Sequence, residues 1–470
     1  MNVESRSYLI SRHIKEVANR FPNNLALIVD GSFLTYSQLY AMALERAAWF
    51  KNNENFTAIF LDGNRSLNDF IDILAAWIAG MPYVPLNPKF PENRCELIKS
   101  TISKLSSLDL SELAYIIFTS GTTGEPKGVP ISDAQLINYI SNLNNAYPLA
   151  PEDRVMQSCE LSFDVSVMQI VSAWFSGAAV CVIPTNYILM SARYVADLNI
   201  TVWNSVPSLI GMSIKAGLLK ANSMPSLRLA FFAGEALSLG SVENFHLAAP
   251  SAKIINAYGP TEATITVTSF EIPLQSISGL PAIIPLGFPN VDVTLSMFDF
   301  EKNMASFPNG ELCIAGTQIT TGYLNRRELN NEKFFTKEGV RWYRTGDIVE
   351  WSDAYGYCYK GRIDRQIKFK GYRIELQDIE SALRAASKSD LVCAVPYPVL
   401  EDGTIEGLVG VIGRSSLRDE NTEQILCSLT SILPSYMVPG KVLIIDEMPL
   451  SINGKVDFKA VQDWVKDQFA

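Results

Sequence analysis

Short apolar runs alternate with longer amphipathic stretches over roughly the first 280 residues of the chain. Strands are predicted where the runs are rich in β-branched residues and end at turn residues, at 57–61, 114–118, 155–158, 178–183, 201–204, 229–232 and 253–256. Helices are predicted where apolar residues recur every three or four positions, as at 67–79 and 134–145. Because strands alternate with helices, we expect an α/β fold with parallel sheets.

The pattern changes after about residue 280, where glycine-punctuated strands predict a smaller β-subdomain at 291–297, 310–315, 348–351 and 357–359. From about residue 361 a basic stretch precedes a predicted helix at 377–386, a strand at 391–395 and a helix after Asn421. We therefore predict a large N-terminal lobe, residues 1–361, of α/β-layered subdomains plus the β-subdomain. A small mobile α+β C-terminal lobe, residues 362–470, would follow a hinge near 361–366.

Charge and hydropathy exclude two classes of protein. The 470-residue chain has 39 Lys and Arg against 49 Asp and Glu, and its net charge of −10 has the wrong sign for binding nucleic acid. The most apolar stretches, such as 71–80 and 174–184, are shorter than the roughly 20 residues that cross a bilayer. No secretory signal is recognised. We expect a cytoplasmic protein that binds neither nucleic acid nor a membrane.

Histidine and cysteine usage limits the chemistry further. Only two histidines are present, His13 and His246, so a Ser-His-Asp mechanism or a multi-histidine metal site has almost nothing to use. The seven cysteines form no C-x-x-C pair, which argues against a structural zinc site and a disulfide framework. We expect reduced thiols in the core.

The segment 118–129, FTSGTTGEPKGV, follows an apolar strand and has the composition of a phosphate-binding loop. Backbone N–H groups and hydroxyls in such a loop donate to phosphate oxygens. It is not a Walker A loop, because Lys127 precedes the last glycine and no Ser or Thr follows the lysine. We predict that phosphates contact Thr119, Ser120, Gly121, Thr122, Thr123, Gly124 and Lys127.

Five motifs in a fixed order resemble those of the adenylate-forming superfamily, which includes adenylation domains of nonribosomal peptide synthetases, acyl-CoA synthetases and luciferases. The motifs are TSGTTGEPKG (119–128), YGPTEA (258–263), YRTGD (343–347), GRIDRQIKFKGYRIE (361–375) and NGKVD (453–457). The stretches SFDVSVMQI, TVWNSVPS and GRIDRQIKFKGYR look closest to D-alanine carrier-protein ligases and free-standing amino-acid adenylation domains. The resemblance implies that ATP and Mg²⁺ are used.

The resemblance also implies roles in nucleotide binding. Tyr258 would lie against adenine, with Asn256 near the amino edge of the base. Thr261 would contact the α-phosphate, and Glu262 would hold Mg²⁺, which prefers hard oxygen ligands. Asp347 would accept hydrogen bonds from the ribose hydroxyls, with Arg362 assisting.

Two further residues are assigned to the reaction itself. Forming an acyl-adenylate brings a carboxylate against the α-phosphate, so a cation is needed between two anions. The resemblance gives this role to Lys455, which follows the Asn453-Gly454 turn. Asp364 would be the hinge about which the C-terminal lobe rotates, carrying Lys455 out and the loop 371–375 in for thioester formation.

The acyl pocket is assigned to the positions that match the selectivity residues of the family: Asp164, Val165, Met168, Asn204, Phe231, Ala233, Ala257, Ile265 and Thr266. An aspartate among apolar neighbours needs a cationic partner, which the α-ammonium group of an amino acid supplies. A fatty or aryl acid would leave the carboxylate buried and unpaired, at a cost of several kcal/mol. We therefore expect an α-amino acid substrate.

The side chain of that amino acid is less defined. Met168 and Phe231 narrow the pocket, Ala233 and Ala257 open it, and Asn204 with Thr266 offers hydrogen-bonding capacity. A small or medium side chain, polar or not, fits. D-Alanyl ligases usually have cysteine at the position of Ala233, which disfavours D-alanine.

We expect an ATP-dependent amino-acid ligase that forms aminoacyl-AMP and transfers the aminoacyl group to a phosphopantetheine thiol. Only 13 residues follow Asp457, so the thiol is expected on a separate carrier protein. One alternative is an acyl-CoA ligase of the same fold, against which Asp164 argues. Another is a catalytically inactive binding or scaffold relative, which would be expected to lose Lys455, Glu262 or Asp347.

Overall fold

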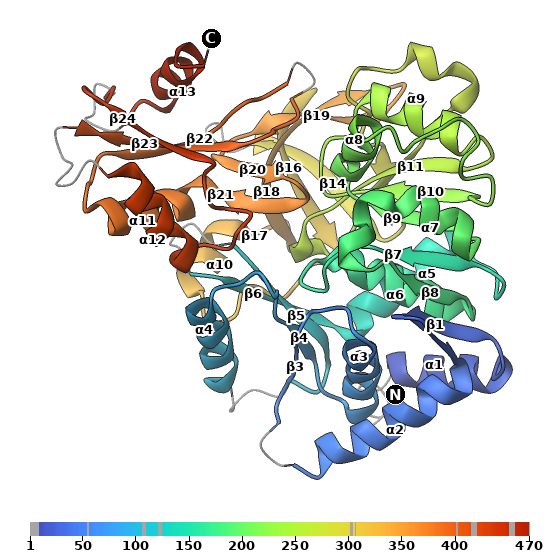
Figure 1. Cartoon of the computed structure of the whole chain (residues 1–470). Helices are drawn as coiled ribbons and strands as arrows, with labels where there is room; N and C mark the ends of the chain where they lie inside the picture. Colours follow the sequence, from blue (N-terminus) through green and yellow to red (C-terminus); the bar gives the residue numbers. More distant parts are fainter. Residues whose placement is uncertain are drawn as a thin grey trace. The chain divides into compact units, whose positions relative to one another are not determined.

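The computed structural model describes residues 9–53, 56–105, 110–120, 125–300, 304–305, 307–400, 403–414, 421–450 and 456–469. The chain forms two compact units, which Figure 1 shows coloured along the sequence. Unit 1 comprises Met1–Pro88, Thr101–Phe118 and Gly128–Ile363, and unit 2 comprises Lys89–Ser100, Thr119–Lys127 and Asp364–Ala470. The lobe boundary predicted between residues 361 and 362 stays a prediction.

A large mixed sheet forms the centre of unit 1. Its strand order is β13 (Phe288–Pro289), β12 (Thr268–Glu271), β11 (Lys253–Tyr258), β10 (Leu229–Phe232), β9 (Val202–Ser205), β7 (Arg154–Gln157), β8 (Ala179–Val182), β1 (Leu25–Val29) and β2 (Ser32–Thr35). Neighbours from β1 to β11 run parallel, whereas the pairs at both edges are antiparallel. The middle strands are buried along their whole length, as expected when helices cover both faces of a sheet.

Helices of unit 1 pack on this sheet (Figure 1). They include α2 (Tyr36–Lys51), α6 (Asp164–Ser176), α7 (Ser191–Leu198), α8 (Pro207–Lys215) and α9 (Leu239–Ala248), and α1 (Leu9–Arg20) packs against α2 and α6. Helix α6 contacts β7, β8 and β9, and almost its whole surface is buried. The residues at the start of α6 are thereby held inside the unit.

A second sheet of unit 1 has the order β3 (Ile59–Leu61), β4 (Tyr83–Pro85), β5 (Leu113–Thr119) and β6 (Lys127–Ser132). Helices α3 (Leu67–Ala79) and α5 (Asp133–Ala146) confirm the two helices predicted from periodicity. Both begin with a capping box, in which Ser66 pairs with Asp69 and Ser132 with Gln135. The cap side chains therefore fix where each helix starts.

The β-subdomain is an antiparallel sheet, and it confirms the change of pattern after residue 280. It contains β14 (Val293–Asp299), β15 (Met304–Ala305), β16 (Asn309–Gly316), β17 (Phe334–Lys337), β18 (Val340–Ser352) and β19 (Gly356–Arg362), with α10 (Arg327–Lys333) before β17. Strand β18 is longer than the predicted 348–351, because its first half pairs with both β16 and β17. The motif YRTGD therefore lies within a strand.

Unit 2 contains the hairpin β20 (Gln366–Phe369)–β21 (Tyr372–Glu375) and a sheet with the order β22 (Val392–Pro396), β23 (Leu408–Gly413) and β24 (Lys441–Ile445). Its helices are α4 (Glu92–Ser103), of which the part up to Ser100 belongs to this unit, α11 (Leu376–Ser387), α12 (Thr422–Ile432) and α13 (Phe458–Asp467). Apolar side chains of β22 and β23 pack against Val461 and Val465 of α13. The C-terminal region thus has its own core. The α/β fold with a large N-terminal and a smaller C-terminal part is confirmed.

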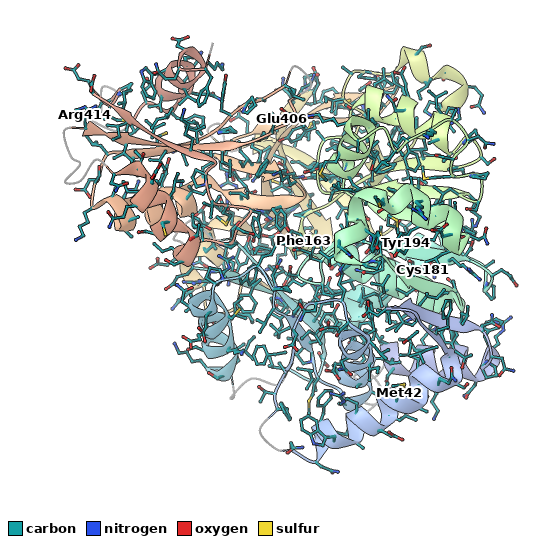
Figure 2. All side chains as sticks on the ribbon, in the orientation of Figure 1. Met42, Phe163, Cys181, Tyr194, Glu406 and Arg414 are labelled. Atoms are coloured by element: carbon teal, nitrogen blue, oxygen red, sulfur yellow. The ribbon has the colours of Figure 1, made fainter. Side chains whose placement is uncertain are left out.

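The cysteines are all free of disulfide bonds. Cys181 on β8 is buried, as expected, while Met42 on α2 lies at the surface (Figure 2). The expectation of core thiols is wrong for Cys427, because this residue faces solvent from α12. Within the described ranges, no helix combines the length and apolarity that spanning a membrane requires.

Candidate active site

Two sheets of unit 1 bring Tyr258, Asp347 and Arg362 together. Tyr258 is the last residue of β11, and its hydroxyl donates a hydrogen bond of 2.5 Å to Asp347 Oδ2. Asp347 and Arg362 oppose each other in the β18–β19 ladder, where Arg362 Nη1 lies 2.5 Å from Asp347 Oδ1. Burial, and next the charge of Asp347, raises the pKa of Tyr258, so the phenol stays protonated. Residues from separate motifs thus form one buried cluster.

Asn256, two residues before Tyr258, is oriented by the backbone. Its Nδ2 donates to the Pro285 carbonyl at 2.8 Å and to the Ile284 carbonyl at 3.3 Å. Both N–H groups of the amide are therefore used inside the fold. The side chain can offer a ligand only the acceptor oxygen.

The chain turns sharply after Tyr258, because Gly259 has no side chain. A Cβ atom at Gly259 would lie 2.6 Å from the Ile265 carbonyl oxygen, so only glycine fits. The turn leads into η3 (Thr261–Ala263), where the fully buried Glu262 accepts a hydrogen bond of 2.6 Å from the Tyr323 hydroxyl. The carboxylate of Glu262 is thereby fixed in position.

The backbone that follows Glu262 is strained. Thr264 and Ile265 have φ angles of 57° and 72°, which β-branched residues rarely adopt. Gln318 supports this turn, since its Nε2 donates to the carbonyls of residues 263, 264 and 266 over 3.1–3.3 Å. Strain that the surrounding structure enforces is a common feature of binding sites.

Asp164 is the first residue of α6 and is buried. Its Oδ2 atom has no hydrogen-bond partner in the described part of the chain. The pKa of Asp164 is raised to about 6, mainly by burial. A hydrogen bond from Thr261 lowers this pKa, and the nearby charge of Glu262 raises it. Burial, and to a smaller extent the charge of Asp164, raises the pKa of three tyrosines: Tyr83, Tyr115 and Tyr139. A cation bound next to Oδ2 would pair with this oxygen and offset the cost of burying its charge.

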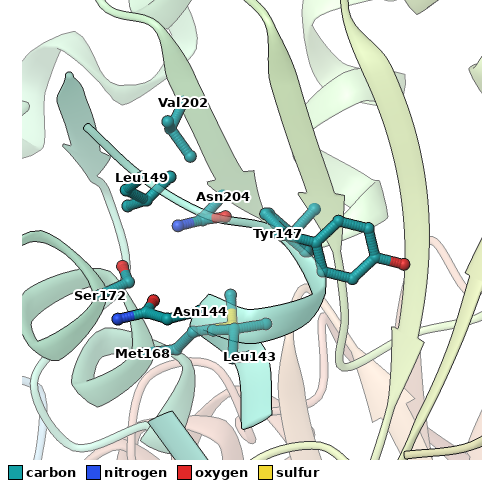
Figure 3. Close-up of a pocket in the computed structure, with 9 residues that line it drawn as sticks. Leu143, Asn144, Tyr147, Leu149, Met168, Ser172, Val202 and Asn204 are labelled. Carbon is teal, nitrogen blue, oxygen red and sulfur yellow. The ribbon is translucent and has the colours of Figure 1, made fainter. Parts of the chain in front are cut away.

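A cavity in unit 1 brings together several of the predicted acyl-pocket residues. It has a small hollow of about 10 Å³ (Figure 3) and an adjoining larger one of about 200 Å³. Their linings include five predicted positions: Met168, Asn204, Phe231, Ala257 and Thr266. Val165, Ala233 and Ile265 are buried but do not line either hollow.

Sequence reasoning missed one whole wall of this cavity. Helix α5 supplies Tyr139 and Leu143, which share a face because they are spaced four residues apart, and Tyr147 follows as the residue that ends the helix. The Thr266 hydroxyl donates to the Tyr139 hydroxyl at 3.2 Å, and the Tyr147 ring packs edge-on against Phe231. The periodicity of α5 could have indicated its apolar face, but not that a cavity lies beside that face.

The ends of the predicted phosphate loop lie in unit 2. Lys127 Nζ is 3.4 Å from Glu375 Oε1, and both side chains are almost fully buried. Gln366 Nε2 also donates to Glu375 Oε1, at 2.6 Å, and Ser120 Oγ donates to the Arg373 carbonyl at 2.8 Å. The Thr119 hydroxyl is buried without a described partner. The loop ends therefore contact the segment 366–375.

Several predicted residues fall outside the described residues: Gly121, Thr122, Thr123, Gly124 and Lys455. Asp364, the predicted hinge, is described and accepts a hydrogen bond of 3.3 Å from the backbone N–H of Gln366. Where the structure describes the chain, no three His, Cys, Asp or Glu side chains cluster as a metal site would require.

Comparison with known proteins identifies the family. The model of the AMP-binding enzyme family matches residues 14–103 and 99–324, well over half of the chain. The chain belongs to the AMP-binding enzyme family. This finding confirms the superfamily resemblance that the five motifs predicted.

Relatives of this AMP-binding enzyme include proteins of assigned activity. The D-alanine–D-alanyl carrier protein ligase of Streptococcus pyogenes (serotype M5, strain Manfredo) is 30% identical, and the match covers 99% of this chain and 95% of the relative. The Vibrio cholerae adenylation domain AlmE, solved with glycyl-adenosine-5'-phosphate, is 29% identical, with a TM-score of 0.88 and 98% of each chain covered. IdnL7 is 26% identical, with a TM-score of 0.70 and coverage of 99% of this chain and 100% of the other.

Proposed function

We propose that this AMP-binding enzyme activates an α-amino acid with ATP and then passes the aminoacyl group to a carrier-protein thiol. In the first step a carboxylate oxygen attacks the α-phosphorus, the aminoacyl-AMP bond forms, and diphosphate leaves. In the second step the thiol sulfur attacks the carbonyl carbon and AMP leaves. Relatives that are named for D-alanyl carrier ligation and that hold glycyl-adenosine-5'-phosphate support both steps.

The observation that carries the proposal is the buried carboxylate of Asp164. Its unpaired Oδ2 atom needs a cation, and the α-ammonium group of an amino acid is a cation of the right size. Thr261 and Glu262 lie close enough to Asp164 to shift its pKa, so the ammonium end would sit next to the residues assigned to phosphate and metal. An acyl-CoA ligase of fatty or aryl acids would leave this carboxylate unpaired.

The nucleotide would be bound by the cluster around Tyr258. The oxygen of Asn256 accepts from the adenine amino group, because both of its N–H groups are already used. The hydroxyl of Tyr258 and the guanidinium of Arg362 hold Asp347 in place, and the remaining lone pairs of this carboxylate accept from the ribose hydroxyls.

Mg²⁺ would be held by the Glu262 carboxylate together with ATP phosphates. This donor set fits, since Mg²⁺ in nucleotide enzymes takes one or two carboxylates plus phosphate oxygens. The metal would neutralise charge on the leaving diphosphate. Thr261 donates to the α-phosphate, the loop 119–127 donates to the other phosphates, and Lys455 supplies the cation between carboxylate and α-phosphate. Rotation about Asp364 separates the two steps.

The test is exchange of labelled diphosphate into ATP, measured with proteinogenic and non-proteinogenic amino acids. Exchange that depends on an α-amino acid is expected, and propionate should be a poor substitute for alanine because it lacks the ammonium group. Equal exchange with amino acids and with their deaminated analogues would contradict the proposal. Loading of a separate phosphopantetheinylated carrier protein tests the second step.

A further inference from the structure

The cavity behind the acyl-pocket residues has an uncharged lining. Both hollows share Leu143, Tyr147, Met168 and Phe231, so they adjoin each other. In the described part of the chain, neither lining contains an acidic or basic side chain. A charged group placed here would lose its hydration without gaining a partner, so the cavity excludes it.

Three amide side chains that line the cavity have a buried oxygen atom without a hydrogen-bond partner among the described residues. Asn204 lines the small hollow and is 1% exposed, and in the part of the chain that the structure describes its Oδ1 atom has no hydrogen-bond partner. Asn144, across the hollow on α5, has an unpaired Oδ1 as well, and so has Gln318 in the larger hollow. If the amide were turned by 180°, its nitrogen would take the place of the oxygen. A buried polar atom would still lack a hydrogen-bond partner. Native interiors seldom leave such groups unsatisfied, which points to a ligand.

The cavity is placed to receive the side chain of a substrate bound at Asp164. Asp164, Met168 and Ser172 follow one another at every fourth position of α6, so they lie along one face of the helix. Met168 and Ser172 line the hollows, and Asp164 is near enough to Tyr139, another lining residue, to raise its pKa. A molecule whose ammonium group pairs with Asp164 can therefore extend its side chain along α6.

We propose that the amino acid activated by this enzyme has an uncharged side chain with a hydrogen-bonding group that pairs with Asn204, and that α5 forms the far wall of its pocket. This inference rests on the proposed function, and it goes beyond it by naming the side-chain class. Glycine has no side chain and alanine only a methyl group, so neither satisfies the Asn204 amide. The substrate would therefore be neither D-alanine, which the name of the Streptococcus pyogenes relative gives, nor the glycyl group that is bound in the AlmE structure.

The experiment compares isosteric pairs of amino acids in the diphosphate exchange assay: threonine with valine, asparagine with leucine, glutamine with methionine and serine with alanine, in both enantiomers. Glycine, aspartate and lysine complete the panel. We expect one polar uncharged amino acid to exceed its apolar partner by at least about 100-fold in kcat/KM, because a pocket built for a hydrogen bond rejects analogues that cannot form it. Preference for glycine, alanine, another apolar side chain or a charged one would overturn the inference alone. If none of the amino acids supports diphosphate exchange, the proposed function is overturned, and this inference with it.

A substitution tests the role of Asn204 in selecting the side chain of the substrate. Asn204→Leu, which keeps the branched shape and the number of heavy atoms of the side chain, should reduce the preference for the polar partner by about 50-fold or more while the KM for ATP stays unchanged. Asn145→Leu makes the same exchange at an exposed position of α5 and should leave the preference unaltered. An unaltered preference in a folded Asn204→Leu protein would refute the role of Asn204. If that variant does not fold, the comparison of isosteric pairs on the wild type decides.

Discussion

Replacing Asp164 by asparagine should stabilise the substrate-free protein and disable it as an enzyme. Burial raises the pKa of Asp164 from its ordinary value near 3.8 to about 6. The folded state then disfavours ionisation, which at pH 8 costs it about 3 kcal/mol relative to the unfolded chain. The penalty disappears only well below pH 3.8 and grows as the pH rises towards 6, so it is about 1 kcal/mol at pH 4.5. Asparagine cannot ionise and avoids it.

Activity should change in the opposite direction. Without the carboxylate, the α-ammonium group of the substrate would be buried without a partner, a loss of about 3–5 kcal/mol. This loss corresponds to a decrease of about 10²- to 4 × 10³-fold in kcat/KM for the amino acid, with the KM for ATP little changed. The measurements are diphosphate exchange and thermal unfolding at pH 4.5 and pH 8, where we expect a gain of about 1–4 °C at pH 8 and less at pH 4.5.

Asp133→Asn is a matched control. Asp133 is also a buried aspartate at the first position of a helix, and burial raises its pKa to about 7. Its replacement should give a similar stability gain at pH 8 with diphosphate exchange unchanged. The reasoning about Asp164 is refuted if Asp164→Asn shows no pH-dependent gain in stability, or if it impairs amino acids and their deaminated analogues equally.

Four further outcomes are expected. Tyr258→Phe removes a buried hydrogen bond of 2.5 Å and should raise the KM for ATP by about 5- to 10-fold with a smaller effect on the amino acid; an unchanged KM in titrations of ATP would contradict this. Lys127→Met leaves the buried Glu375 without its cation and should destabilise the protein by about 2–4 kcal/mol. Adding Glu375→Gln should restore part of the lost free energy of unfolding, measured by denaturant unfolding. Lys455→Ala should lower diphosphate exchange by about 10²-fold or more without changing the melting temperature, and near-normal exchange would reject its role. Asp364→Pro should impair one half-reaction more than the other when diphosphate exchange and carrier loading are measured separately, and equal wild-type rates would exclude residue 364 as the pivot.

Local patterns in the sequence predicted most elements and marked the motif residues. Helix α3 matches its predicted range of 67–79 because its apolar spacing and its Ser66 cap are both local features. The motifs likewise predicted Tyr258, Asp347 and Arg362 as nucleotide ligands one by one. Their hydrogen-bonded cluster could not be predicted, because it depends on where β11 of one sheet ends relative to β18 and β19 of another.

Tertiary structure also decided the shape of the acyl pocket. The sequence predicted Met168, Asn204 and Phe231 as lining residues but not Tyr139 or Gln318, which no motif marks. Helical periodicity shows which side chains of α5 share a face, but what that face meets depends on packing between segments more than 100 residues apart, such as residues 139 and 266. The same holds for Asp164: the sequence supplies a carboxylate among apolar residues, and only the packed fold buries it and leaves one oxygen without a partner.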